Sequence, residues 1–512
     1  MNAMAHLSQK QKLFAFATMC VGMFIALLDI QIVAASLRDI GGGLSAGADD
    51  TAWVQTSYLI AEIVVIPLSG WLSRVLSTRW LFAISAAGFT LTSLLCGLAW
   101  DIQSMIVFRA AQGFLGGSMI PLVFTTVFVF FEGKQRVVAA ATIGALASLA
   151  PTIGPALGGW ITDNFSWHWL FFINLIPGVF VTVVVPMLVK IDEPDFSLLK
   201  TGDWAGIALI AMFLGCLEYT LEEGPRWNWL EDDVIRTTFY ITVVSGVLFV
   251  WRGLTAAHPV VDLRALKDRN FLLGCIFSFV TGIGLFGTIY LTPLFLGRVE
   301  GYSALQIGQA VFSTGIFQIL SIPVYAILAN RVDLRWLLMF GLALFAISMF
   351  EFTPITHDWS GTELLFPQAL RGIAQQMSVP PVVTLTLGAL PPSRLKQASG
   401  LFNLMRNLGG AMGIAGCATV LNDRTNLHFL RLAEHLNPTN EAMNNFLSGI
   451  DQGAETSTMA LRSLWQLTYR EAQTMTYSDA FFSIMVCFVI ATVLVPLMRK
   501  VAAPTGPSAD AH

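Results

Sequence analysis

Three ionisable side chains lie inside stretches that are otherwise apolar and long enough to cross a bilayer: Asp29, Glu62 and Arg109. A charge at bilayer depth costs roughly 2.5–3.5 kcal/mol even on lenient scales, so each of these residues needs a physical reason. A carboxylate whose ionisation responds to cavity hydration and to a nearby arginine can load and release protons. The alternative is a structural charge pair that locks two helices together.

Their depths favour a proton site. Asp29 is about eight residues from one end of its apolar stretch and Arg109 about six from the same side of the membrane, roughly 12 and 9 Å at the helical rise. We therefore predict that Asp29 is the principal proton-coupling carboxylate and that Arg109 tunes it. Glu62, near the middle of its stretch, is the second candidate. Three more polar residues inside apolar stretches are expected to line the pathway or cavity: Gln112, Arg371 and Arg406.

A run of small and cyclic residues, APTIGPALGGW at 150–160, interrupts a further apolar stretch. A soluble helix would not tolerate so many, whereas a membrane helix can, because neighbouring helices and local rearrangement satisfy the backbone groups that proline frees. Gly154 and Gly158 share one helix face and allow a neighbouring backbone to approach closely. Two glycines at this spacing are also what a generic helix-packing face would contain. The longer pattern also includes Pro155 and Gly159.

Composition assigns the chain to the membrane-embedded class. Of its 512 residues 55% are hydrophobic and only 12% charged, about half the charged share of a soluble domain. A net charge of −4 gives no reason to expect nucleic acid as a partner. The seven histidines have no metal-ligand spacing, and no cofactor motif is credible, so neither a metal nor a cofactor is expected. The six cysteines are predicted to be buried free thiols.

Fourteen apolar stretches are long enough to be transmembrane helices. An excess of Lys and Arg in alternate loops predicts that both termini are cytoplasmic. Glu218, Glu222 and Glu223, at the outer end of the seventh stretch, are explained by interfacial solvation. The predicted spans are 13–37, 52–73, 80–100, 103–130, 137–161, 167–189, 204–222, 237–255, 271–297, 303–329, 334–354, 362–390, 397–421 and 479–498.

The chain also repeats itself. Gly70 to Arg74, followed by Arg79-Trp80-Leu81, has the spacing of 326–330 followed by Arg335-Trp336-Leu337. This predicts two parallel six-helix halves with an inserted helix pair. The arginines of these loops, Arg74, Arg79, Arg331 and Arg335, are membrane anchors by default. The repeat raises the alternative that the loops form a cytoplasmic gate, with Gly70, Arg74, Arg79, Asn330 and Arg335 as its residues. The predicted division is an N-terminal segment 1–12, a first half 13–189, a linker with two helices 190–270, a second half 271–500 and a tail 501–512.

Residues 422–478 form the largest polar insertion, predicted to be periplasmic and to lie within the second half. Leu461, Leu464, Trp465 and Tyr469 recur at helical spacing, which suggests an amphipathic helix on the membrane surface or on a partner. A solvated loop is the alternative.

Several stretches together resemble the fourteen-helix drug:proton antiporter branch of the major facilitator superfamily. The resemblance is carried by LDIQIV at 28–33, RAAQG at 109–113, GPALGG at 154–159 and WHWLFFINLIPG at 167–178. It implies an all-α polytopic membrane protein with a major facilitator fold, in which GPALGG packs against a helix of the other half. Arg74, Ser77, Gln31 and Ala34 depart from the family pattern, so gate chemistry and substrate preference can differ.

The resemblance implies a proton-driven exporter of amphiphilic, hydrophobic toxic compounds in the bacterial inner membrane, and not an enzyme. It further implies a periplasmic adaptor subunit and, through it, an outer-membrane channel as partners. Two alternatives remain open at this stage. One is an exporter of a specific endogenous metabolite, lipid or siderophore. The other is a non-transporting membrane sensor or scaffold, which has little need for the charges at Asp29 and Arg109.

Overall fold

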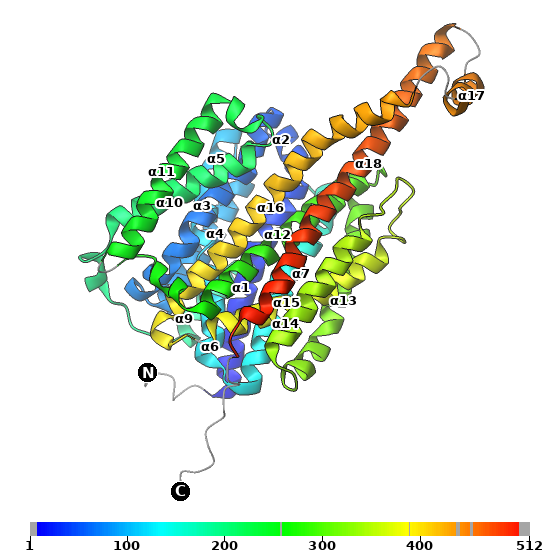
Figure 1. The fold of residues 1–512 in the computed structure, drawn as a ribbon. Coiled ribbons are helices and arrows are strands. Elements are labelled where there is room, and N and C mark those ends of the chain that lie inside the picture. The colour runs from blue at the N-terminus through cyan, green and yellow to red at the C-terminus, as the bar shows by residue number, and fades with distance from the viewer. Residues whose placement is uncertain (1–7, 257–258, 389, 437–440, 451–453, 501–512) are drawn as a thin grey trace.

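The computed structural model describes residues 8–256, 259–388, 390–436, 441–450 and 454–500, and all regular structure in them is helical. Long helices form one bundle, and two of them project from the end opposite the start of α1 (Figure 1). The first part of the chain forms α1 (Gln9–Ala35), α2 (Leu37–Gly43), α3 (Ala48–Val75), α4 (Thr78–Gly97), α5 (Ile102–Gly116), α6 (Met119–Phe130), α7 (Gly133–Asn164), α8 (Trp169–Phe172) and α9 (Leu175–Leu188).

A connecting region and a second set of helices follow. Short 3₁₀ turns are labelled η. The connecting region comprises η2 (Phe196–Leu199), α10 (Trp204–Glu223), η3 (Trp229–Glu231), α11 (Asp233–Thr255) and η4 (Leu263–Lys267). The remaining elements are α12 (Arg269–Arg298), α13 (Ala304–Ala329), α14 (Leu334–Glu351), α15 (Leu365–Leu387), α16 (Pro392–Glu434), α17 (Glu441–Ile450), α18 (Ala454–Leu494) and η5 (Val495–Leu497).

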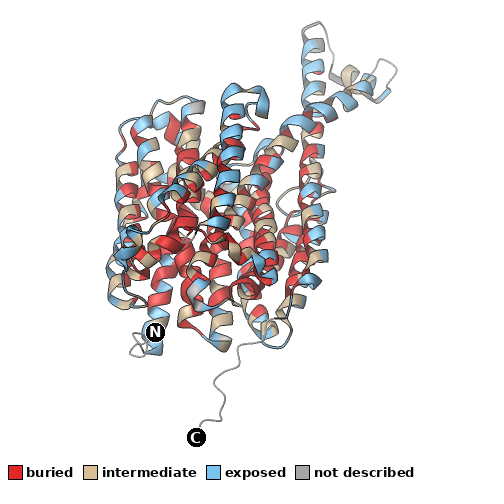
Figure 2. Cartoon of the chain, turned by 60° about the vertical axis from the view of Figure 1, so that its left-hand side comes forward, coloured by how far each residue is buried: buried red, intermediate tan, exposed pale blue. Residues whose placement is uncertain are grey.

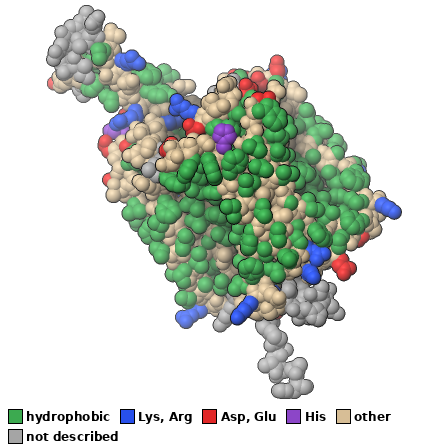
Figure 3. Space-filling view, turned by 180° about the vertical axis from the view of Figure 1, so that it is seen from behind, with side chains coloured by type: hydrophobic (Ala, Val, Ile, Leu, Met, Phe, Trp, Pro, Cys, Tyr) green, Lys and Arg blue, Asp and Glu red, His purple; other side chains and the backbone are tan. Residues whose placement is uncertain are grey.

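Within the described residues, twelve helical stretches are long and apolar enough to cross a membrane. Hydrophobic side chains cover the middle of the face seen in Figure 3, and most charged side chains gather towards its two ends. The twelfth and thirteenth predicted spans correspond to α15 and α16, which are not among the twelve. Both are long enough, but they carry buried polar side chains, such as Gln375 and Gln376 on α15 and Asn403 on α16, that lower their mean hydropathy.

Two predicted spans are interrupted in the structure. The fourth is divided into α5 and α6, which meet at Gly117 and Ser118, and the sixth into α8 and α9. By contrast α7 stays one helix of 32 residues with Pro151 and Pro155 inside it. Buried residues fill the centre of the bundle, and the projecting helices are largely exposed (Figure 2).

The connecting helices pack against both sets of helices. α10 lies beside α11 and also contacts α3 and α16. Trp53 of α3 stacks on Tyr219 of α10, with ring centroids 5.5 Å apart. Trp229, which follows α10, donates its indole N–H to the Thr419 hydroxyl of α16 at 3.0 Å. The inserted region therefore packs against both halves, although most of α10 and α11 is not buried.

Within the described residues, the polar insertion is mostly helical. Most of it extends two helices of the bundle, because α16 continues to Glu434 and α18 begins at Ala454. Trp465 and Tyr469 stack on each other, and both meet Phe429 of α16 at centroid distances of 6.1–6.2 Å. These aromatic contacts explain why a polar sequence stays helical there. Leu461, at 56% exposure, remains uncovered.

Candidate functional site

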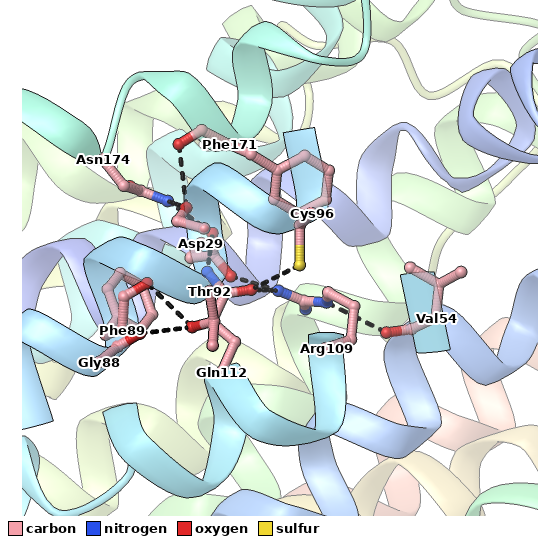
Figure 4. A network of polar contacts seen from close by, with 11 residues as sticks. Asp29, Val54, Gly88, Phe89, Thr92, Cys96, Arg109, Gln112, Phe171 and Asn174 are labelled. Carbon is pink, nitrogen blue, oxygen red and sulfur yellow. Dashed lines mark hydrogen bonds and ion pairs between the residues drawn. The ribbon is translucent and has the colours of Figure 1, made fainter. Parts of the chain in front are cut away.

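Asp29 and Arg109 form an ion pair inside the first set of helices (Figure 4). The guanidinium Nη1 of Arg109 donates to the Asp29 carboxylate at 2.5 Å, and both side chains are fully buried. The other carboxylate oxygen accepts from Asn174 at 2.7 Å and from Gln112 at 3.2 Å. Each of these groups donates an N–H, so the network satisfies an ionised carboxylate.

The rest of the arginine is held by a backbone carbonyl and two aromatic rings. Its Nε donates to the carbonyl of Val54 at 3.2 Å, while the guanidinium carbon lies 4.2 Å from the ring centroid of Tyr58 and 5.8 Å from that of Phe171. Such cation–π contacts stabilise a desolvated arginine. Its Nη2 has no hydrogen-bond partner and is buried. Both N–H groups of Nη2 are therefore unpaired among the described residues.

Sequence reasoning missed Asn174 and Tyr58. Asn174 occupies the N-cap position of α9, and Ser93 of α4 accepts from its amide at 3.0 Å, so the residue connects Asp29 to α4. A polar amide within the apolar run Trp169–Leu188 is a signal that could have identified it. Tyr58 gives no comparable signal, because its importance depends on α3 and α5 packing side by side.

The glycine face of α7 packs against α1. A Cβ atom built on Gly158 would lie 2.6 Å from the carbonyl oxygen of Ile32, and one built on Gly154 would lie 2.4 Å from the Cβ of Gln31. Gly154 and Gly158 themselves meet α1, whereas the expected contact of GPALGG with the other half is made by Ala156 of the same motif. The contact with α13 uses a neighbouring position, where a Cβ on Gly308 would lie 2.2 Å from that of Ala156. α7 is thus held between the helix that carries Asp29 and a helix of the second set.

Glu62 lies at a cavity between the two sets of helices. Its side chain is only 3% exposed, and its Oε1 has no hydrogen-bond partner. Glu218 and Glu222 of α10 line the same cavity. Interfacial solvation therefore does not explain Glu218, which is 4% exposed, whereas Glu222 is partly exposed. The sequence could not reveal this, because the face that α10 turns inwards is set by its packing on α3 and α16.

Comparisons with known proteins agree with this architecture. Residues 19–414 match the family model described as Major Facilitator Superfamily. This chain belongs to the major facilitator superfamily. Its relatives include the colistin resistance protein EmrB of Acinetobacter baumannii, 38% identical over 95% of this chain and 96% of that one. The multidrug export protein EmrB of Haemophilus influenzae is 32% identical over 84% of each chain.

Solved structures support the fold alone. The proton:xylose symporter XylE bound to 6-bromo-6-deoxy-D-glucose has a TM-score of 0.62 and covers 98% of each chain at 12% identity. This is a low sequence identity for so complete a structural match. The chain is therefore an EmrB-like member of the major facilitator superfamily and belongs to a family of transporters, not of enzymes.

The two halves of this major facilitator protein repeat one packing detail. A Cβ on Gly113 of α5 would lie 2.3 Å from the carbonyl oxygen of Tyr58 in α3. A Cβ on Gly372 of α15 would lie 2.3 Å from the carbonyl oxygen of Thr314 in α13. Gly113 follows Gln112, three residues after Arg109, and Gly372 follows Arg371, three residues after Gln368. The same polar spacing therefore precedes the same close helix contact in each half.

Three residues expected at the substrate cavity have different surroundings in this conformation. Gln112 belongs to the Asp29 network, where it accepts from Arg109 at 2.8 Å. Arg371 is fully buried and donates to Thr314 at 2.8 Å, and no carboxylate pairs with it among the described residues. Arg406 lies 5.2 Å from the ring centroid of Phe124. Their role in substrate binding stays a prediction.

Contacts between the halves also occur at the end where α1 begins. A Cβ on Gly70 would lie 2.8 Å from the backbone of α16, at the carbonyl oxygen of Lys396. Lys396 donates to Asp192 at 2.5 Å and to the carbonyl of Ser73 at 3.2 Å. Sequence analysis missed the Lys396–Asp192 pair, because its members are about two hundred residues apart and neither lies in the repeated motif.

The other predicted gate residues make local contacts. Arg79 lies against the ring of its neighbour Trp80, and Asn330 caps α13 through the carbonyl of Ala326. Arg335 pairs with Asp333 at 2.9 Å. Partial burial acts to raise the pKa of Asp333, but the hydrogen bonds and charge of Arg335 outweigh it and lower that pKa. Arg74 is partly buried, and its Nε has no hydrogen-bond partner. Among these residues, Gly70 makes the direct contact with the second half.

Proposed function

We propose that this protein is a proton-driven exporter of amphiphilic, largely hydrophobic compounds. The observation that carries the proposal is the buried Asp29–Arg109 pair, fully enclosed and connected to three helices of one half. Family membership supports transport, and the printed names of the relatives, multidrug export and colistin resistance, support a toxic amphiphile as the substrate class.

Asp29 would act as the proton carrier. Its carboxylate now accepts three N–H donors, so a proton arriving there would oppose at least one of them. Proton uptake must therefore loosen the contact with Arg109, Gln112 or Asn174. Each of these residues lies on or caps another helix, so protonation changes how α1 is held against α5 and α9.

The glycine contacts supply a route from this site to the interface between the halves. Ile32 lies three residues after Asp29, nearly one helical turn, and packs against Gly158 of α7. The other contact of α7 is with α13, through Ala156 and Gly308. A shift of α1 would thus be passed through α7 to the second half. Alternating access proceeds by rigid-body rocking of the halves around a central site, and this contact chain would couple it to the proton.

The proposal includes a location and partners. We place the protein in the bacterial inner membrane with both termini cytoplasmic and residues 422–478 periplasmic. The projecting helices α16 and α18 would then offer exposed apolar side chains, such as Leu430 and Leu461, to a periplasmic adaptor. Through the adaptor, substrate would reach an outer-membrane channel.

Transport by purified protein in liposomes tests the function. A fluorescent amphiphilic dye is expected to move against its gradient when a pH gradient is imposed, and a protonophore is expected to stop it. Transport that ignores the pH gradient would contradict proton coupling. Gradient-driven exchange of an endogenous lipid or metabolite, with no dye or hydrophobic acid transported, would favour the specific exporter. No transport of any of these compounds would favour the sensor or scaffold.

Cysteine labelling tests the orientation. In a variant without the native cysteines, Glu434→Cys at the end of α16 is expected to react with an impermeant maleimide in intact spheroplasts. Arg331→Cys, between α13 and α14 at the other end of the bundle, is expected to react only after permeabilisation. The reverse pattern of labelling would overturn the proposed topology.

A further inference from the structure

The cavity at the interface of the two halves is lined by three glutamates and, among the described residues, by no lysine or arginine. It is lined by Glu62 of α3, by Glu218 and Glu222 of α10, and by residues of α1, α12 and α16. Glu218 and Glu222 are four residues apart, so both project from the same face of α10. The remaining walls are mostly apolar and include Phe286 and Ile414.

Two of these carboxylates have buried oxygens without a partner. The Oε1 of Glu62 and the Oε2 of Glu218 make no hydrogen bond, although both side chains are more than nine-tenths buried. Buried polar groups in proteins are normally paired, because an unpaired one retains its desolvation cost. Both residues line the cavity, so these unpaired oxygens are candidate partners for a ligand that enters when the cavity widens.

The nearby cations are already engaged or face a different acid. Arg109 pairs with Asp29, and Arg406 lies close enough to Glu62 to interact with its charge. Glu223, the next acid on α10, accepts from the indole of Trp227 at 3.1 Å and does not line the cavity. No ion pair to Glu218 or Glu222 is present in the part of the chain that the structure describes.

We propose that this cavity binds a lipophilic organic cation, with Glu218 and Glu222 of the inserted helix as its counter-charges. The apolar walls would contact the hydrocarbon part of the ligand, and the two carboxylates would compensate its charge. A metal ion fits less well, because the described residues contain no group of three or more His, Cys, Asp or Glu side chains suited to hold one. This inference rests on the proposed export function and narrows its substrate class.

The cavity has a volume of about 50 Å³ in this conformation, enough for water but not for a drug-sized molecule. Its walls come from α1 and α3 of one half, from α12 and α16 of the other, and from α10 between them. Separation of the halves therefore widens it. In this conformation α10 contacts both α3 and α16, so the inserted helix places its carboxylates at the junction of the two halves.

Direct binding of tetraphenylphosphonium to the purified full-length protein tests the site. Glu218→Gln together with Glu222→Gln is expected to raise the Kd by at least about tenfold, since each change removes a counter-charge at a desolvated site. Glu223→Gln, the same change one residue further along the helix, is expected to stay within about twofold of the wild type. Binding of tetraphenylborate, an anion of similar size, is not expected to weaken.

A double variant that binds tetraphenylphosphonium as the wild type does would overturn the proposal. Equal loss of the cation and the anion would also overturn it, because that points to collapse of the cavity. If the double variant does not fold, as judged by its thermal melting, Glu222→Gln alone carries the test with the same two criteria and an expected loss of about threefold or more.

Failure of the site and failure of the export function give different results. If the wild type binds tetraphenylphosphonium but shows no proton-driven transport, the proposed export function is contradicted and the proposed cation site still holds. If the double variant transports a neutral dye and binds tetraphenylphosphonium normally, the proposed cation site is contradicted and the proposed export function still holds. Loss of transport of every substrate with unchanged tetraphenylphosphonium binding would assign the two carboxylates to proton movement and overturn the cation site.

Discussion

Asp29→Asn is expected to reduce proton-driven efflux to background while the protein still folds and inserts. Asparagine keeps the size of the side chain, and its one carbonyl oxygen can still accept from Arg109, while its NH2 group gives up at least one other contact, as a protonated acid would. What it loses is the ability to exchange a proton. Dye transport in liposomes under an imposed pH gradient measures the effect, and thermal melting measures the fold.

The matched control is Asp163→Asn, the same change at an exposed position near the end of α7. It is expected to transport normally. Glu62→Gln separates the two candidate carriers. If Asp29→Asn pumps normally and Glu62→Gln is inactive, the coupling role belongs to Glu62.

The arginine partner adds a stability readout to the same prediction. Arg109→Ala leaves Asp29 buried without its cation, and breaking a buried pair typically costs about 3–5 kcal/mol. We expect it to melt at a lower temperature than Asp29→Asn and to lack transport. Arg109→Lys is expected to recover transport only in part, because lysine cannot donate from a planar fork to both the carboxylate and the carbonyl of Val54.

The second large effect is expected at Gly158, where Leu should abolish exchange without preventing insertion. A Cβ there would lie 2.6 Å from a carbonyl oxygen and 3.0 Å from the Cα of Ile32, both backbone atoms that cannot rotate away. The added side chain must push α1 from α7 and so break the contact that connects Asp29 to the second half. Gly158→Ala is expected to be partly impaired. Membrane yield and transport are measured together.

Gly416→Leu is the control for this substitution. Gly416 also lies in a long helix, but a Cβ built on it meets nothing within 4 Å. It is expected to transport at close to the wild-type rate. Wild-type transport by a well-inserted Gly158→Leu protein would show that the α1–α7 contact has no role in exchange.

Much of this fold could be predicted from the sequence, because a helix that crosses a membrane must be long, apolar and internally hydrogen-bonded. The charges inside such helices, Asp29 and Arg109, were identifiable for the same reason. The partners of a known residue were harder to predict. That Gly158 faces Ile32, and not a helix of the second half, depends on how α7 is rotated, and small residues alone do not determine the rotation.

The surroundings of two segments could not be predicted from the sequence, for the same physical reason. Glu218 looked interfacial because it is near the end of an apolar helix, yet the packing of α10 on two other helices buries it. For residues 422–478 the sequence left an amphipathic helix and a solvated loop open, and the described part is largely two helices that meet through Phe429, Trp465 and Tyr469. In both cases the environment is supplied by a segment distant in the sequence.

The length of α16 has a consequence for control of the pump. This single helix of 43 residues, about 65 Å long, begins beside the Lys396–Asp192 pair, passes the cavity at Gly410 and ends in the projecting part beyond Phe429. This one helix therefore connects three places in the protein. If opening of the cavity shifts the outer end of α16, a protein bound at that end would bias the opening, because coupling between two sites is reciprocal.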